Sequence, residues 1–484
     1  MGASVEVDVP EIEGDGMSLP LPAAAPPNGY VLEEVFVAGT AKRFMSAAEP
    51  DDGHWTVGAD GEAPFRTRLI VRRPTDVADF SGTVIVEWFN VTVIEASPEW
   101  TYLVDEIGRE GHAYVGVSAQ RQGVEGGATV LDVDVDDDVV ADAGVSTDTG
   151  GLKNTDPARY GSLTHPGDAY SFDMFAKIGH LLAENPERIL GDLVPERIIA
   201  AGESQSAAFV ATFINAIHPI DPVFDGFLVH SRSVIAAPVD GDYARVRVEA
   251  GFHGVGGEVP SATLIRDDID VPVLIFITET DLTALRYALV RQPDTDHLRT
   301  WEVAGTAHAD VQLLRTIVGG HRDAMLGDLL GCGAINTGPH KEVLSAAFHH
   351  LVDWVAGGDP PPVAPRIQMV EAEGHDVDPL IARNDLGMAI GGVRNPLTDV
   401  PVFIPTGDRG GVDPAGVDGD VCALFGSTRQ LSAETLARVH GSGEAYVAAF
   451  RESAHAQVDA GFLLLADAEA LIAEAEENRK LFEM

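Results

Sequence analysis

The 484-residue chain is poor in basic residues. It contains 32 Lys and Arg, of which only five are Lys, against 76 Asp and Glu, so its formal net charge is −44. A surface of this sign repels the phosphates of nucleic acids and the headgroups of anionic membranes. We therefore expect no nucleic-acid partner and no membrane partner.

Metal and cofactor motifs are also lacking. Cys332 and Cys422 do not have the spacing of a zinc site or of a disulfide framework, although one bridge between them is possible. There is no Gly-x-x-x-x-Gly-Lys-Ser/Thr phosphate loop and no His-Glu-x-x-His pair. The acidic run from Asp132 has Asp137 where a calcium loop needs glycine. We predict a protein without a bound metal or cofactor.

No long hydrophobic run is present. No stretch reaches the roughly 18 apolar residues of a membrane span, and the N-terminal "MGASVEVDVPEIEGDG" has no basic segment followed by an apolar one. The hydrophobic fraction of 45% and the charged fraction of 22% are typical of a globular protein. These features predict a cytoplasmic protein.

Short apolar runs alternate along the chain with amphipathic stretches. The runs are "TRLIVRRP", "TVIVEWFN", "HAYVGVSA", "RIIAAG", "DGFLVH", "PVLIFIT" and "TWEVAG". Several are apolar on consecutive positions, as strands buried on both faces of a parallel sheet are. Residues 98 to 110, 167 to 184 and 204 to 217 are expected to be the helical crossovers. The pattern predicts an α/β fold with a mostly parallel central sheet, helices on both faces, and insertions at 120 to 166 and 231 to 266.

A Pro- and Gly-rich stretch, "GGDPPPVAPRI", marks a turn or linker near residue 360. The remainder contains the strand-like "VPVFIPTG" and a helical stretch from roughly residue 443 to 480. We predict a single domain over residues 1 to 484. Its core spans about 28 to 360, and a C-terminal extension at about 361 to 484 packs on that core.

The segment "RIIAAGESQSAAFVATFINAIHP" runs from an apolar strand through a Gly-Glu-Ser-Gln-Ser turn directly into an apolar helix. A strand, a Gly-x-Ser-x-small turn and a helix form the nucleophile elbow of α/β hydrolases. Ser204 is the predicted nucleophile, and Ser206 stands where glycine is usual. The alternative is that Ser204 merely caps a helix.

A serine nucleophile needs a base and an acid, which follow it in this fold in the order acid, then His. "VPVLIFITETD" is an apolar strand ending in Glu279 and Asp281, and "TWEVAGTAHAD" is a strand followed by a loop with His308. Open α/β sheets place their sites at such strand ends. We favour Asp281 as the acid that orients His308. Glu279 is the alternative, because on an extended chain both side chains share one face.

The predicted oxyanion hole uses the backbone N–H of Gln205, the residue after the nucleophile. Its second donor is expected in the loop after "TVIVEWFN", where Phe89 and Asn90 are the candidates. The alternative for Asn90 is a turn residue that caps the strand end.

Several blocks outside the elbow carry a family resemblance. They are "VIVEWFNVT", "YVGVSAQRQGV", "RYGSLTHPGDAYSFDMF", "AAGESQSA", "VAGTAHAD" and "GGVRNPLTDVPV". With these blocks the chain resembles the bacterial alpha/beta hydrolase domain family, whose members are regarded as serine esterases. The resemblance implies an α/β-hydrolase fold with Ser204 and His308 as catalytic residues. It leaves His165, Asp168 and Arg121 without a role; they either line the site or hold an insertion.

The combined pattern predicts a serine hydrolase that cleaves a small-molecule carboxylic ester through an acyl-Ser204 intermediate. An amidase or a lactone hydrolase with the same triad is the close alternative. The alternative of another class is a catalytically silent α/β-hydrolase scaffold that acts as a binding protein. An intact triad argues against a silent scaffold.

The net charge makes a prediction about salt. Either it is adapted to a saline interior, or it reflects compositional drift in a GC-rich genome. If the interior is saline, the melting temperature should rise substantially from dilute buffer to about 1 M KCl, because salt screens the repulsion among surface carboxylates. A melting temperature that stays constant across this range would favour drift.

Overall fold

The computed structural model describes residues 5–8, 17–18, 25–92, 94–127, 151–243, 262–317, 332–370, 380–408 and 421–483. The acidic run that begins at Asp132 and the "GFHGVGGEVP" segment, both in the predicted insertions, lie outside these residues. Within the described residues, no helix combines the length and the apolar character needed to cross a bilayer.

A large sheet with the strand order β1-β2-β3-β5-β4-β6-β7-β8-β9 forms the centre of the protein. Its strands are β1 (Glu6–Asp8), β2 (Tyr30–Ser46), β3 (Val57–Pro74), β4 (Thr83–Trp88), β5 (Ala113–Val117), β6 (Arg197–Glu203), β7 (Gly226–His230), β8 (Val273–Thr278) and β9 (Leu298–Val303). Neighbouring strands from β5 to β9 are parallel, whereas β1, β2 and β3 pair in antiparallel fashion. The mostly parallel sheet is therefore confirmed.

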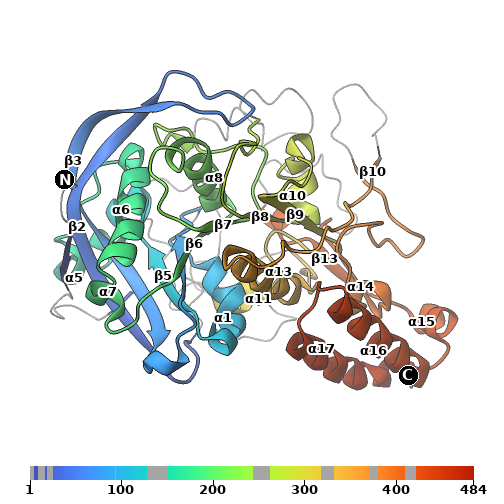
Figure 1. Cartoon of the computed structure of the whole chain (residues 1–484). Helices are drawn as coiled ribbons and strands as arrows, with labels where there is room; N and C mark the ends of the chain where they lie inside the picture. The colour runs from blue at the N-terminus through green and yellow to red at the C-terminus, as the bar shows by residue number, and fades with distance from the viewer. Residues whose placement is uncertain are drawn as a thin grey trace.

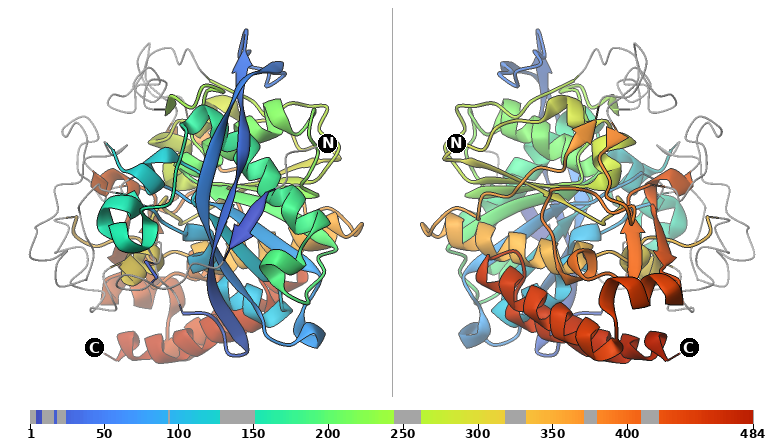
Figure 2. Two further views of the ribbon diagram at one scale, coloured as in Figure 1. Left: turned by 90° about the vertical axis from the view of Figure 1, so that its left-hand side faces the viewer. Right: turned by 90° about the vertical axis from the view of Figure 1, so that its right-hand side faces the viewer.

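The N-terminal side of the sheet is a long hairpin that the sequence pattern did not predict. Strands β2 and β3 are 17 and 18 residues long, and Figure 2 shows them running along most of the molecule. Their burial is uneven, with a buried stretch around Val35 to Val37 and exposed residues at Ala59 to Glu62. The hairpin therefore reaches beyond the core at one end.

Helices cover both faces of the sheet (Figure 1). Helices α6 (Ser171–Glu184) and α8 (Gln205–Thr212) lie on one face, and α1 (Pro98–Glu110) and α13 (His340–Val355) on the other. Successive residues of β6 alternate between the two layers: Ile198 packs with α6 and α8, and Ile199 packs with α1 and α13. Because both faces are buried, the strand is apolar at consecutive positions.

Shorter elements connect and extend these layers. They are η1 (Val77–Asp79), α2 (Arg121–Glu125), α4 (Gly151–Thr155), α5 (Pro157–Tyr160), η2 (Asp168–Tyr170), α7 (Glu187–Leu190), the π-helix η3 (Phe213–Ile217), α10 (Glu279–Thr283), η4 (Tyr287–Val290), α11 (Val311–Ile317), β10 (Met369–Val370), β11 (Leu380–Ile381), α14 (Pro396–Asp399), β12 (Phe403–Thr406), η5 (Val421–Leu424), β13 (Ser427–Gln430), α15 (Ala433–His440), α16 (Gly443–Asp459), α17 (Leu465–Asn478) and η6 (Arg479–Phe482).

The C-terminal extension ends in a group of helices, α15 to α17 (Figures 1 and 2). The prediction of one helical stretch from about 443 to 480 is wrong, because the chain turns between α16 and α17, where Gly461 has a φ of 81°. The extension contacts the core: Arg109 of α1 forms two hydrogen bonds of 2.7 and 3.1 Å with Asp467. The ring of Phe462 lies 5.0 Å from that of Trp301 in β9. These contacts join the C-terminal extension to the core.

Cys332 and Cys422 form a disulfide. The bond joins the segment before α13 to η5 in the C-terminal extension, across 90 residues of chain. The bridge that the sequence left open is thus present. Structural disulfides are unusual in a reducing cytosol, so this bond does not support the predicted cytoplasmic location.

Candidate active site

Ser204 lies at a sharp turn between β6, which ends at Glu203, and α8, which begins at Gln205. Its φ of 58° and ψ of −117° are a strained conformation for a residue with a side chain. The Ser204 side chain makes no capping hydrogen bond to α8, so the alternative of a simple helix cap is wrong. The predicted succession of strand, serine turn and helix is present.

Small residues make this turn possible. A Cβ atom on Gly202 would lie 2.9 Å from Cγ2 of Val210 and 3.0 Å from the backbone of Ser206, too close without a shift of the helix. Ser206 has a direct role in the turn: its Oγ accepts a hydrogen bond from the Glu203 N–H at 3.0 Å and donates one to the Glu203 carbonyl at 2.8 Å. A serine can therefore stand where glycine is usual, because its hydroxyl forms two hydrogen bonds that close the turn.

Three predicted side chains meet above the sheet. Nε2 of His308 is 2.8 Å from Oγ of Ser204, and Nδ1 of His308 is 2.7 Å from Oδ1 of Asp281. Ser204 follows β6, Asp281 follows β8 and His308 follows β9, and these strands are parallel. Because the carboxyl ends of parallel strands lie at one edge of a sheet, the three residues come together from distant parts of the chain.

The structure joins His308 to Asp281 and not to Glu279. The chain is not extended after β8: Thr278 caps α10, and Asp281 accepts a hydrogen bond from the Thr278 N–H at 2.7 Å. Side chains two residues apart on a helical turn point in different directions. The expectation that Glu279 and Asp281 share one face is therefore wrong.

Glu279 instead holds the neighbouring loops together. It accepts hydrogen bonds from the N–H groups of Gly305 at 2.6 Å and Gly407 at 3.0 Å, and from Arg383 at 2.9 Å. Gly305 precedes His308 in its loop, whereas Arg383 and Gly407 belong to the C-terminal extension. Glu279 thus connects the extension to the loop of His308.

The charges around His308 define its tautomer. Burial opposes the ionisation of Asp281, but His308 and the hydrogen bonds that Asp281 accepts hold its pKa below the usual value. Burial likewise disfavours the charged form of His308, but the carboxyl groups of Glu203 and Asp281 outweigh it and raise the pKa of His308. The ionised Asp281 binds the Nδ1–H, so Nε2 of neutral His308 is free to accept the Ser204 proton.

The predicted oxyanion donors differ in whether their backbone N–H groups are already hydrogen-bonded. No hydrogen bond from the backbone N–H of Gln205 to another described residue is present, as expected at the first position of a helix. The N–H of Phe89 donates to Val117 at 3.1 Å, and that of Asn90 donates to Ala96 at 3.0 Å. Neither is free, so the structure does not support the predicted second donor.

Asn90 has a local structural role. Its Oδ1 accepts the Thr92 N–H at 2.7 Å, and its Nδ2 donates to the carbonyl and to Oε2 of Glu203, at 3.1 and 3.2 Å. This is the alternative of a turn residue at the strand end. The next N–H in the loop, that of Val91, has only a long contact of 3.4 Å to Oε1 of Gln205.

The sequence patterns did not identify two polar residues of the site. Glu203 is buried, and its Oε1 lies 3.4 Å from Nε2 of His308. Gln120 follows β5 and exchanges amide hydrogen bonds with Gln205. Glu203 occupies a position that the elbow pattern leaves unspecified. The one sequence signal for Glu203 and Gln120 is that each lies at or just after the end of a strand.

His165, Asp168 and Arg121 hold a loop next to the site. Nε2 of His165 is 2.9 Å from the carbonyl of Ala119, and Asp168 accepts the backbone N–H of Arg121 at 2.6 Å. These contacts fasten the chain before α6 to the segment after β5. Of the two interpretations given for these residues, the structure shows the one in which they pin an insertion.

A buried row of hydrogen bonds supports the loop of His308 from the α1 and α13 side. His340 Nδ1 can only donate to the carbonyl of Ala307, at 3.2 Å, so its Nε2 must accept from Nε2 of His230, at 2.7 Å. His230 Nδ1 then accepts a hydrogen bond from the O–H of protonated Glu99, at 3.2 Å. Burial raises the pKa of Glu99 to about 8 and lowers that of His230 to about 3, so the row is uncharged near neutral pH.

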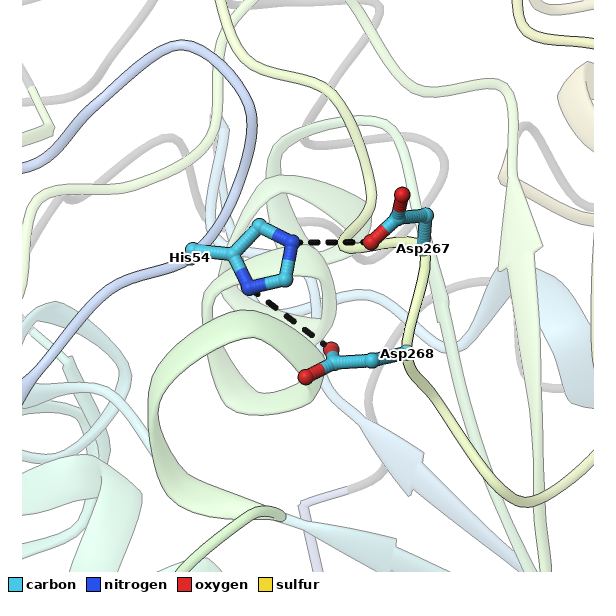
Figure 3. Close-up of side chains that lie close together, drawn as sticks. All are labelled: His54, Asp267 and Asp268. Atoms are coloured by element: carbon cyan, nitrogen blue, oxygen red, sulfur yellow. Dashed lines mark hydrogen bonds and ion pairs between the residues drawn. The ribbon is translucent and has the colours of Figure 1, made fainter.

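One exposed histidine lies between two carboxylates (Figure 3). Nε2 of His54 is 2.9 Å from Asp267, and its Nδ1 is 3.8 Å from Asp268. The carboxylates face different nitrogens of the ring, and Asp268 also pairs with Arg266 at 2.5 and 2.9 Å. The hydrogen bond between His54 and Asp267 joins the β2–β3 connection to the segment before β8.

The layered sheet, with a serine turn after β6, defines an α/β-hydrolase fold. The chain belongs to the alpha/beta hydrolase domain family, whose model matches residues 6–473. The match covers nearly the whole chain, including the C-terminal extension, so the resemblance found from the sequence blocks is confirmed. A search of curated proteins found no matching relative.

Solved structures of esterases were also found. An esterase from Rhizomucor miehei has 12% identity and a TM-score of 0.31, covering 69% of this chain and 85% of its own. A thermostable esterase from Pseudomonas putida ECU1011 has 13% identity and a TM-score of 0.30, covering 63% of this chain and 81% of its own.

The contacts of Asp281 and Glu279 predict different effects of their substitution on ester turnover. Asp281→Asn should lower ester turnover by up to about 10⁴-fold, because the imidazole loses the group that fixes its tautomer. Glu279→Gln should lower the melting temperature, because Arg383 loses one of its two acidic partners and keeps only Asp408, but should leave turnover per folded molecule close to wild type. Both variants are assayed with a p-nitrophenyl ester alongside thermal unfolding. A near-normal rate for Asp281→Asn and a collapsed rate for Glu279→Gln would contradict the assignment.

Proposed function

We propose that the protein is a serine hydrolase that cleaves a carboxylic ester of a small molecule through an acyl-Ser204 intermediate. The observation that carries this proposal is the unbroken row of hydrogen bonds from Oγ of Ser204 through His308 to Asp281. Membership of the alpha/beta hydrolase domain family supports it. An amide or a lactone would require the same three groups, and no contact among the described residues favours either.

In the proposed acylation step, Nε2 of His308 takes the proton of Ser204 while Oγ attacks the ester carbonyl carbon. The carbonyl electron pair moves onto its oxygen. The backbone N–H of Gln205 is the proposed first donor to that oxyanion. We propose the N–H of Val91 as the second, because its present acceptor is 3.4 Å away and easily replaced.

Collapse of this intermediate expels the alcohol, which takes the proton from Nε2 of His308 and leaves the acyl group on Ser204. A water molecule then gives a proton to His308 and attacks the acyl carbon. The carboxylic acid leaves as Oγ regains its proton. Throughout the cycle Asp281 stays ionised and stabilises the positive charge that forms on His308, as its lowered pKa favours.

The proposed nucleophile is tested by Ser204→Ala. Turnover of p-nitrophenyl esters should fall by several orders of magnitude, because only the oxyanion donors and substrate binding would remain. The matched control is Ser345→Ala, a buried serine of α13 whose hydroxyl has no hydrogen-bond partner among the described residues, and it should keep wild-type turnover. Both variants should unfold near the wild-type temperature. A Ser204→Ala variant that retains about a tenth or more of the turnover would remove Ser204 from the mechanism.

A further inference from the structure

We propose that Glu203 is a positioning residue that controls whether His308 can act as a base. As a carboxylate it stabilises the imidazolium, and as a carboxylic acid it occupies the nitrogen that must accept the Ser204 proton. The catalytic consequence rests on the function proposed above, whereas the coupling between Glu203 and His308 does not.

Contacts on both carboxyl oxygens of Glu203 place it for this role. Its Oε1 lies 3.4 Å from Nε2 of His308, the same nitrogen that is 2.8 Å from Oγ of Ser204. Its Oε2 accepts a hydrogen bond from Nδ2 of Asn90 at 3.2 Å, and the same amide binds the Glu203 carbonyl at 3.1 Å. Glu203 is only 4% exposed, so water does not screen the charge of its carboxylate well. Asn90 thus holds one oxygen and leaves the other facing the imidazole.

Proton positions decide what that second oxygen does. Since Asp281 accepts the Nδ1–H, neutral His308 has one lone pair on Nε2, which can accept one O–H. A protonated Glu203 that donates to this lone pair displaces the hydroxyl of Ser204 and blocks the base. An ionised Glu203 has no proton to donate. Once Ser204 transfers its proton, the new Nε2–H faces the carboxylate, and the two opposite charges attract.

The surroundings allow Glu203 to change its protonation state in the neutral to alkaline range. Burial raises its pKa to about 8; the neighbouring Glu99 and Asp281 add to this rise, while His308 and the hydrogen bond from Asn90 oppose it. Each element that packs against Glu203 contributes a polar group. Glu99 and Tyr102 come from α1, and His230 of β7 is the residue paired with Glu203 of β6. Asp281 follows β8, and His308 follows β9.

The direct test is the pKa of His308, measured by NMR titration of the histidine ring nitrogens without substrate. The His308 signal is assigned from its loss in His308→Gln. In Glu203→Gln the pKa of His308 should fall by about 1 to 3 pH units, because a nearby carboxylate that favours the imidazolium is removed. In Glu203→Asp, which keeps a charge on a shorter side chain, the decrease should be smaller.

The matched control is Glu99→Gln. Glu99 is a fully buried carboxyl group that contacts His230, whereas Glu203 lies against Nε2 of His308. The glutamine amide still donates to His230, and the carboxyl group of Glu203 that faces His308 stays in place. The pKa of His308 in Glu99→Gln should therefore stay near the wild-type value.

The same variants give a kinetic signature that a purely structural role would not produce. In Glu203→Gln the rise of kcat/KM that follows the ionisation of Glu203 should disappear, because the amide oxygen accepts from Asn90 and the amide N–H then faces Nε2 of His308 at every pH. The plateau at high pH should fall by about tenfold or more, because the imidazolium loses its partner. The ratio of variant to wild-type rate should thus decrease as the pH rises.

The outcomes separate the two proposals. If the pKa of His308 is the same in wild type, Glu203→Gln and Glu203→Asp, the role of Glu203 is overturned, whatever Ser204→Ala does. If the pKa falls as expected but Ser204→Ala keeps its activity, the proposed function fails and the coupling stands. Should Glu203→Gln fail to fold, an unchanged His308 pKa in Glu203→Asp would overturn the proposal, and a lowered one would support it.

Discussion

The hydrogen bond between Asp281 and His308 is the interaction on which the rest of the site depends. It joins two loops that follow neighbouring parallel strands, and it leaves Nε2 of His308 facing Ser204. It forms only because Thr278 turns the chain into α10 and directs Asp281 toward the imidazole. The same bond determines how Glu203 acts. Glu203 faces Nε2 of His308, and Nε2 accepts the Ser204 proton only because Asp281 binds the Nδ1–H.

The C-terminal extension contributes to this geometry from outside the sheet. Glu279, one position after the cap of α10, binds Arg383 and Gly407 of the extension and also Gly305 in the loop of His308. Asn336 binds the carbonyls of Gly305 and of Thr406 in β12, at 3.1 and 2.9 Å. The extension therefore buttresses the loop of His308, which agrees with a family model that spans both parts of the chain.

The sequence predicted those features that depend on chain order and on buried strands. Ser204, Asp281 and His308 could be found because each follows an apolar strand, and parallel strands end at one edge. The misses depend on contacts between segments with no periodic pattern. The N–H of Asn90 is taken by a carbonyl of the same loop, and Glu203 approaches His308 only because the turn after β6 is so tight. Likewise, residue spacing gave no sign of the turn that divides the last long helical stretch.

The central claim is that Ser204 becomes acylated with the help of His308, and mass spectrometry of the trapped intermediate tests it most directly. The protein is mixed with a slowly hydrolysed ester, quenched in acid and digested, and the modified peptide is sequenced. The account predicts one acyl group on Ser204 in the wild-type protein and none in His308→Gln. Continued ester hydrolysis with no acyl group on Ser204, or with the group on another residue, would contradict it.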